Sequence, residues 1–286
     1  MRLDDFKPSS NVEDRRGMNF PGGGGGLGIG TVIVVGLLGW ALGINPMTLL
    51  GGLEALQGSG QQQTTQGRKG PPDDQVAQFA AKVLATTEQV WTDQFRQQGR
   101  TYTKPTMVLF SGRVQSACGD ASAAVGPFYC PVDQKIYLDL DFFKELATRF
   151  GAPGDFASAY VIAHEVGHHV QNLIGILPKL QQAQRNAATQ REANGISVRS
   201  ELMADCLAGV WANHANTDYR VLEPGDVDEG MKAAAAVGDD RLQRQATGTV
   251  VRDNFTHGSS QQRVTWFMRG LKTGNMNQCN TLQGTP

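Results

Sequence analysis

The chain has 286 residues, of which 40% are hydrophobic and 19% are charged, so it can bury a core and is not an intrinsically disordered chain. Its formal net charge is −1, which argues against a broad nucleic-acid-binding surface, and we expect no nucleic-acid partner. Its four cysteines contain no C-x-x-C pair, which excludes a disulfide-dense scaffold and the usual zinc ribbon.

An apolar run near the N-terminus predicts a transmembrane helix. Residues 27–44 read LGIGTVIVVGLLGWALGI and contain no charged side chain. This is about the length that a helix needs to cross roughly 30 Å of hydrocarbon, so we expect a membrane-spanning helix over 27–50 in contact with the lipid bilayer. A cleaved signal peptide is the alternative, but the preceding segment is long and of mixed charge, and no clear cleavage site follows.

Basic residues flank this run unequally. Four of them precede it: Arg2, Lys7, Arg15 and Arg16. After the run, the first basic residue is Arg68. The positive-inside rule then places residues 1–26 in the cytoplasm and the rest of the chain outside it. We therefore expect a single-pass protein of the cell membrane with an extracytoplasmic domain.

The composition changes again after the apolar run. Residues 51–72 are rich in Gly, Gln and Thr without periodicity, which is typical of a flexible linker, so we expect the folded domain to occupy 73–286. The domain opens with helical spacing of apolar residues, which Asp73 or Asp74 can cap and Gly99 can end.

The rest of the domain alternates between a few strand patterns and many helical ones. Residues 106–110 are a continuous apolar run and 135–140 alternate polar with apolar residues, so both predict strands, with a Gly/Ser/Ala-rich loop over 111–126 between them. Helical patterns follow over 142–150, 156–175, 178–192, 195–214, 228–246 and 259–271. The expected fold class is α+β, mostly helical, with a small sheet.

The cysteines favour disulfides if the domain lies outside the cytoplasm. Cys118 and Cys130 are twelve residues apart and enclose glycines that permit a turn, so this pair is favoured. Cys206 and Cys279 then remain as the second pair, although four cysteines allow three pairings. Four reduced, buried cysteines are the alternative for a cytoplasmic protein.

The pattern that carries chemistry is H-E-x-x-H at His164–His168. On a helix, His164 and His168 project from one face and can share one Zn²⁺ ion. Glu165 lies beside the first of these histidines, where it can act as the general base toward a water molecule that zinc activates. The preceding residues are apolar, as a buried helix requires, and Gly167 permits close approach of another element.

A third zinc ligand is available downstream. Glu201 and Asp205 share a helix face, so Glu201 can complete the ligand set while Asp205 accepts a hydrogen bond from a ligand histidine. Glu192 is the alternative third ligand, but it has no acidic partner four residues on. Two solvated acids on a surface helix are a further alternative, which the apolar neighbours of Glu201 and Asp205 disfavour.

The remaining histidines and one arginine receive different expectations. His257 and Arg263 lie where a loop enters a helix, and either could stabilise negative charge on a substrate carbonyl oxygen. A helix cap followed by a salt bridge is the alternative for this pair. His169 points away from His168 around the helix and is expected to pack or to support the site, and His214 is expected near a helix C-terminus.

Several long strings resemble the neutral zinc metallopeptidases of bacteria: NVEDRRG, SACG-ASAAVGPFYCP, YVIAHEVGHHVQ, SELMADCLAGVWA and FTHGSSQQR. The resemblance covers nearly the whole chain, including the apolar segment. It implies a compact zincin fold of the gluzincin type, with His164, His168 and Glu201 as ligands of one catalytic Zn²⁺ and Glu165 as base. His257 and Arg263 are similar to the H-P-x-x-x-x-R segment of membrane gluzincins, with Gly258 at the proline position.

These observations predict a membrane-anchored, zinc-dependent peptidase that acts on a peptide or protein substrate. An extended substrate would pair with an edge strand near the active-site helix, for which residues 135–140 are the candidate, with residues 126–129 beside the cleft. A catalytically silent scaffold of the cell envelope is one alternative, although Glu165 would have no use there. A cell-wall amide as substrate is another, although no wall-binding repeat is present.

Overall fold

The computed structural model describes residues 1–18 and 67–282 of the chain. It contains a five-stranded sheet in the order β2-β1-β3-β7-β6 and a separate two-stranded hairpin, β4-β5. The strands are β1 (Val12–Asp14), β2 (Arg68–Lys69), β3 (Thr106–Phe110), β4 (Arg113–Ser116), β5 (Gly119–Ser122), β6 (Phe128–Cys130) and β7 (Lys135–Asp139). Strands β1, β3 and β7 run parallel, whereas β2 and β6 pair antiparallel at the two ends of the sheet.

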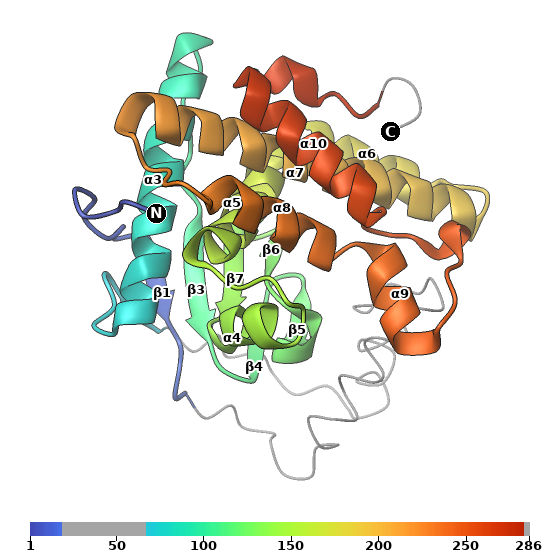
Figure 1. The fold of residues 1–286 in the computed structure, drawn as a ribbon, viewed down its shortest axis with the longest axis horizontal. Helices are drawn as coiled ribbons and strands as arrows, with labels where there is room; N and C mark the ends of the chain where they lie inside the picture. Colours follow the sequence, from blue (N-terminus) through green and yellow to red (C-terminus); the bar gives the residue numbers. More distant parts are fainter. Residues whose placement is uncertain (19–66, 283–286) are drawn as a thin grey trace.

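Helices make up most of the described chain and lie over one side of the sheet (Figure 1). They are α3 (Gln75–Gln97), α4 (Asp141–Thr148), α5 (Asp155–Leu173), α6 (Ile176–Arg185), α7 (Gln190–Tyr219), α8 (Asp226–Ala236), α9 (Asp239–Thr247) and α10 (Ser260–Thr273). Helix α5 packs against α3, α7 and α8, and α7 in turn packs against α10. The expected mostly helical α+β fold with a small sheet is confirmed.

The sheet is buried on both faces, which explains why β3 is a continuous apolar run. Met107 and Leu109 belong to the main core with the helices, whereas Val108 and Phe110 belong to a smaller core that includes residues of the β4-β5 hairpin. A strand that is covered on both sides needs apolar residues at every position. The hairpin itself occupies residues that the sequence predicted as a loop.

One helix prediction, the cap of α3, is confirmed, and another, a single helix over 228–246, is wrong. Asp74 caps α3 as expected, because its side chain accepts a hydrogen bond from the backbone N–H of Ala77. The single helix expected over 228–246 is wrong, because α8 and α9 are separate and Gly238 lies between them. A side chain at Gly238 would come within 2.4 Å of the backbone nitrogen of Ser260, so this position belongs to a tight contact with the start of α10.

The prediction of a single-pass membrane protein is wrong. Among the helices of residues 1–18 and 67–282, none has both the length and the apolar character to span a bilayer. The expected helix over 27–50 lies outside the described residues. A single crossing there would place residues 12–14 and 106–110 on opposite sides of the membrane, whereas β1 pairs directly with β3 and β2. The expectation that the N-terminal residues and the folded domain lie on opposite sides of a membrane is therefore wrong.

Both disulfides are confirmed. Cys118 is bonded to Cys130, which joins the turn of the β4-β5 hairpin to strand β6. Cys206 is bonded to Cys279, which joins α7 to the short helical turn after α10. The second bond lies in the core, with both cysteines at most 1% exposed.

Candidate metal centre

The H-E-x-x-H residues lie on α5, the most deeply buried helix of the site. His164 and Glu165 are 6% and 7% exposed although both are ionisable. The helix can lie this deep because Gly167 faces α7: a Cβ at this position would meet the backbone oxygen of Ala204 at 2.9 Å. The expectation that Gly167 permits close approach of another element is confirmed.

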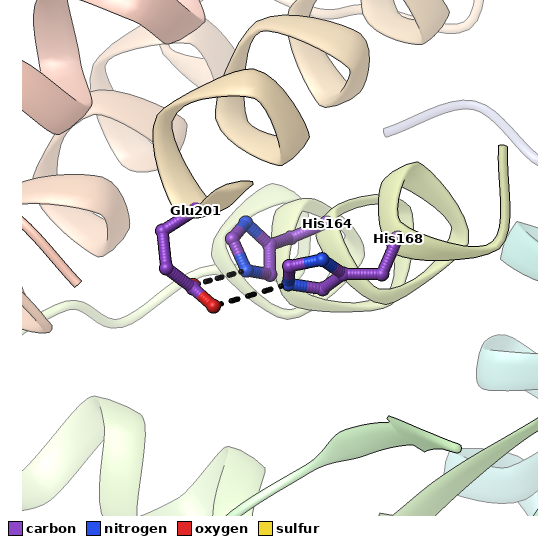
Figure 2. Close-up of side chains that lie close together, drawn as sticks. All are labelled: His164, His168 and Glu201. Atoms are coloured by element: carbon purple, nitrogen blue, oxygen red, sulfur yellow. Dashed lines mark hydrogen bonds and ion pairs between the residues drawn. The ribbon is translucent and has the colours of Figure 1, made fainter. Parts of the chain in front are cut away.

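Helix α7 brings Glu201 onto the two histidines, as Figure 2 shows. The Nε2 atom of His164 lies 3.1 Å from one Glu201 carboxylate oxygen, and that of His168 lies 3.3 Å from the other. The three candidate ligand atoms lie within 4.8 Å of one another. Two imidazole nitrogens and one carboxylate are a ligand set of catalytic zinc sites, which leave a further position open for water or substrate. The residues present therefore fit a zinc ion.

A second acidic group among the described residues fits zinc less well. Asp155, Asp226 and Glu229 offer oxygen atoms only, whereas zinc sites in proteins favour nitrogen and sulfur ligands as well. The amino group of Met1 lies among these carboxylates, 2.7 Å from Asp155. A positive charge already occupies the place where a cation would bind.

Glu192 is placed away from the cluster. Its carboxylate accepts a hydrogen bond of 2.9 Å from the backbone N–H of Ala188 at the start of α7. It precedes Glu201 by nine residues, which is about 14 Å along a helix. The structure therefore brings Glu201, and not Glu192, to the two histidines.

Asp205 lies one turn after Glu201 on α7 and contacts the ring nitrogen of His164 that faces away from Glu201. It is 0% exposed, and the Nδ1 atom of His164 donates to it at 2.8 Å. This contact turns the Nε2 atom of His164 toward Glu201. Burial alone would raise the pKa of Asp205, but the charges of Arg263 and His164 outweigh burial and hold it at about 2.

Arg263 forms the layer behind Asp205. Its Nε and Nη2 atoms donate to the two carboxylate oxygens at 2.8 and 2.9 Å, and Nη1 donates to the backbone oxygen of Val237 at 3.2 Å. Tyr160, which the sequence had not singled out, also donates to Asp205. Arg263 is 3% exposed and borders the cavity, but its donors are directed at protein groups. These contacts favour a positioning role over the predicted contact with substrate.

His257 is held at the other side of the site by a loop that Asp239 organises. One Asp239 oxygen accepts the backbone N–H groups of Thr256, His257 and Gly258 at 2.6–2.8 Å, and the other lies 3.4 Å from the His257 ring. Burial alone would lower the pKa of His257, but the charges of Glu201 and Asp239 outweigh burial and raise it. The ring also lines the cavity.

Glu165 also borders the cavity but is not one of the clustered ligands. Burial raises the pKa of its carboxyl, and the charges of His164 and His168 oppose this effect only in part. A carboxylate with a raised pKa accepts a proton more readily near neutral pH. Burial likewise opposes charge on His164, but the carboxylates of Asp205 and Glu201 prevail and raise the pKa of His164 to about 10.

His169 connects α5, the helix that carries His164 and His168, to strand β6 through a hydrogen bond with Tyr129. Its Nε2 lies 2.7 Å from the backbone oxygen of Thr103, which can only accept, so the ring proton is on Nε2. Nδ1 then accepts from the hydroxyl of Tyr129 at 3.0 Å, and that hydroxyl accepts from Asn172 at 3.0 Å. His169 thus supports the site, as expected, rather than binding the metal. His214 lies elsewhere and bonds the backbone oxygen of Gly274, just after α10.

The cluster opens into a cavity of about 660 Å³. Strand β6 lies along it through Phe128 and Tyr129 and stands at one end of the sheet. The candidate edge strand over 135–140 is wrong, because β7 is paired on both sides, by β3 and by β6. The edge beside the cavity is formed by β6 instead, one strand earlier in the chain.

Comparisons with known proteins identify the family of the chain. The family described as "Putative neutral zinc metallopeptidase" matches residues 1–282. The chain is 47% identical over 292 aligned residues to the uncharacterized protein YpfJ of Escherichia coli strain K12, with 98% of each chain covered. It is 52% identical over 190 residues to the uncharacterized protein Rv2575 of Mycobacterium tuberculosis, with 63% of each chain covered. No solved structure matches the chain.

Proposed function

Because the chain belongs to the neutral zinc metallopeptidase family, we propose that it hydrolyses peptide bonds with one zinc ion held by His164, His168 and Glu201. The observation that carries the proposal is the convergence of these three residues, from two helices, on one point at the wall of a cavity. Glu165 borders the same cavity, and a purely structural metal site would not need that carboxylate.

A bound zinc ion lowers the pKa of water and polarises a carbonyl group. Glu165 accepts the proton of the attacking water and returns it to the leaving amine, which its raised pKa favours. His257 lines the same cavity, where a ring N–H can donate to the carbonyl oxygen of the substrate, which becomes negative during hydrolysis. Asp205, held by Arg263, fixes the His164 ring so that Nε2 faces the metal position.

The test compares the zinc-loaded chain with its Glu165→Gln variant on a diverse peptide mixture, read by mass spectrometry. We expect the substitution to lower kcat by about 10²–10⁴-fold, the range for loss of a general base, while one zinc ion per chain is retained. The matched control is Glu192→Gln, which removes an exposed carboxylate at the start of α7 and should change neither quantity.

Three outcomes would contradict the proposal or the roles given to its residues. Cleavage that persists in Glu165→Gln would remove Glu165 from the base role. A zinc-replete, folded chain that cleaves no peptide would instead favour a scaffold protein of the same family. Loss of zinc from the Glu165→Gln variant alone would mean that Glu165 is a ligand and not the base.

A further inference from the structure

Among the described residues, the cavity walls beyond the candidate metal centre carry no formal charge. Only six of the described lining residues have His, Asp, Glu, Lys or Arg side chains: His164, Glu165, His168, Glu201, His257 and Arg263. All six belong to the site already described. The other lining residues are apolar or carry amide and hydroxyl groups.

An apolar wall begins directly beside the metal ligands. Val161 precedes His164 by three residues on α5, so the two side chains are neighbours on one helix face, and Val161 is 7% exposed. Phe142 and Phe150 continue this wall, with ring centroids 6.2 Å apart, and Leu242 joins them from α9. This side of the cavity suits a bulky apolar side chain.

Another part of the cavity lining is a stripe of uncharged polar residues on α7 that ends at the candidate ligand Glu201. Gln190, Asn194, Ser197 and Glu201 follow one another on α7 at spacings of four, three and four residues, so they share one helix face. The side-chain amide of Gln184 on α6 donates to the Ser197 hydroxyl at 2.7 Å, whereas the side-chain amide of Gln181 has no hydrogen-bond partner among the described residues. Amides of this kind can bond the backbone of a peptide but cannot neutralise a charge.

We infer that the cavity selects peptide segments without charged side chains, with an apolar residue on the Val161 side and neutral polar or apolar residues along the α7 stripe. The inference rests on the proposed function, since it names the substrate class of that same site. A charged side chain that entered the cavity would lose hydration without finding an opposite charge outside the metal centre. A glutamine or leucine at the same position would not incur that cost.

The first test measures binding rather than cleavage. The zinc-loaded full-length Glu165→Gln protein is titrated with peptide sets that differ only by Gln, Glu or Lys at one position. We expect a peptide with Glu or Lys at the varied position to have a Kd about tenfold higher than the peptide with Gln there. This should hold for varied positions on both sides of the scissile bond. Equal affinity for the charged and neutral members at every position would overturn the inference.

A matched pair of variants tests whether the α6–α7 wall causes the selection. Gln181 lines the cavity, whereas its neighbour Gln182 is exposed and does not. Gln181→Lys should shift the preference toward Glu-containing peptides by about tenfold, and Gln182→Lys should leave it unchanged. Equal shifts in both variants, or none in either, would contradict the assignment of this wall.

Cleavage by the unaltered, zinc-loaded chain separates the inference from the proposed function. If uncharged peptides bind selectively but are not cleaved, the proposal of peptidase activity is wrong, whereas the inference that the cavity selects uncharged segments is supported. If charged and uncharged peptides are cleaved equally well, the proposal of peptidase activity is supported, whereas the inference that the cavity selects uncharged segments is wrong. The two failures are therefore distinguishable.

Discussion

Asp205 of α7 connects side chains of two other helices, α5 and α10. Its carboxylate accepts from His164, Arg263 and Tyr160 in a place with no exposure to solvent. A buried carboxylate is tolerated here because the guanidinium of Arg263 neutralises it with two hydrogen bonds. The orientation of His164 therefore depends on a residue of α10 that does not contact the metal position directly.

Asp205→Asn should weaken zinc binding by about 10–100-fold, as the loss of a carboxylate behind a ligand histidine does. It should also lower the free energy of unfolding by about 3–5 kcal/mol, because Arg263 would be left buried without its counter-charge. Competition with a chelator and urea denaturation measure the two effects. The control is Asp218→Asn, whose side chain is 47% exposed on the same helix. Zinc affinity equal to that of the unaltered chain would refute the role given to Asp205.

At the scale of elements, the site depends on a close crossing of α7 and α10. Two glycines make that crossing possible. A Cβ at Gly270 would lie 1.9 Å from the backbone oxygen of Cys206, and one at Gly209 would lie 2.1 Å from that of Phe267. Because α7 carries Asp205 and α10 carries Arg263, the crossing also sets the contact between these two side chains.

Gly270→Ala should lower the free energy of unfolding by at least about 2 kcal/mol, because backbone atoms cannot move aside as a flexible side chain can. The zinc affinity should fall with it, since α10 would be displaced from Asp205. Thermal and urea denaturation test the first expectation. Gly195→Ala is the matched control: Gly195 is exposed on α7 with open space around it, so alanine there should be neutral or stabilise by up to about 1 kcal/mol.

At the scale of the whole molecule, residues 12–14 are part of the domain and not an appendage. Glu13 lies in β1 and is 4% exposed, where it bonds Arg15 at 2.8 Å and Lys135 of β7 at 2.9 Å. Burial alone would raise the pKa of Glu13, but the hydrogen bonds from Arg15 and Lys135 prevail and hold it at about 2. This network joins the N-terminal strand to a strand more than a hundred residues later.

The network predicts a specific sensitivity to acid. The folded-state pKa of Glu13 is about 2 and lies below its ordinary value of 4.5, so the stabilisation is complete above pH 4.5 and is lost as the pH falls toward 2. Glu13→Gln should be less stable than the unaltered chain at neutral pH and lose less stability over that acid range. Urea denaturation at a series of pH values measures this, with Glu145→Gln, at a 46% exposed side chain, as control. Parallel pH curves for Glu13→Gln and the unaltered chain would exclude the assignment.

The two disulfides should contribute unequally to stability. Their cysteines are 12 and 73 residues apart in the sequence. The chain-entropy description assigns about 3 kcal/mol to the shorter loop and about 4 kcal/mol to the longer one. Replacing Cys206 and Cys279 by alanine should therefore lower the free energy of unfolding more than replacing Cys118 and Cys130, as urea denaturation can show. The reverse order would mean that the hairpin bond carries the larger share.

Local patterns were sufficient for the features that depend on neighbouring residues. The four-residue spacing of His164 and His168, the cap at Asp74 and most of the helical periodicities could be read because helix geometry relates residues a few positions apart. The break at Gly238 between α8 and α9 could not be read in this way. The apolar run of β3 could likewise be read as a strand. Its burial on both faces could not, because the second cover is a hairpin whose residues have no strong strand pattern.

Contacts between distant segments needed the folded chain. For Arg263 the sequence left open a contact with substrate or a salt bridge to an unnamed partner, and the fold pairs it with Asp205, 58 residues earlier. Residues 12–14 were assigned to the far side of a membrane, but the sheet places them beside β3. In both cases the contact forms because distant segments pack together and buried charges pair. Such contacts depend on the three-dimensional arrangement of the chain and leave no periodic signal in the sequence. The residue types available for zinc chemistry were therefore readable from the chain, whereas their partners were decided by tertiary structure.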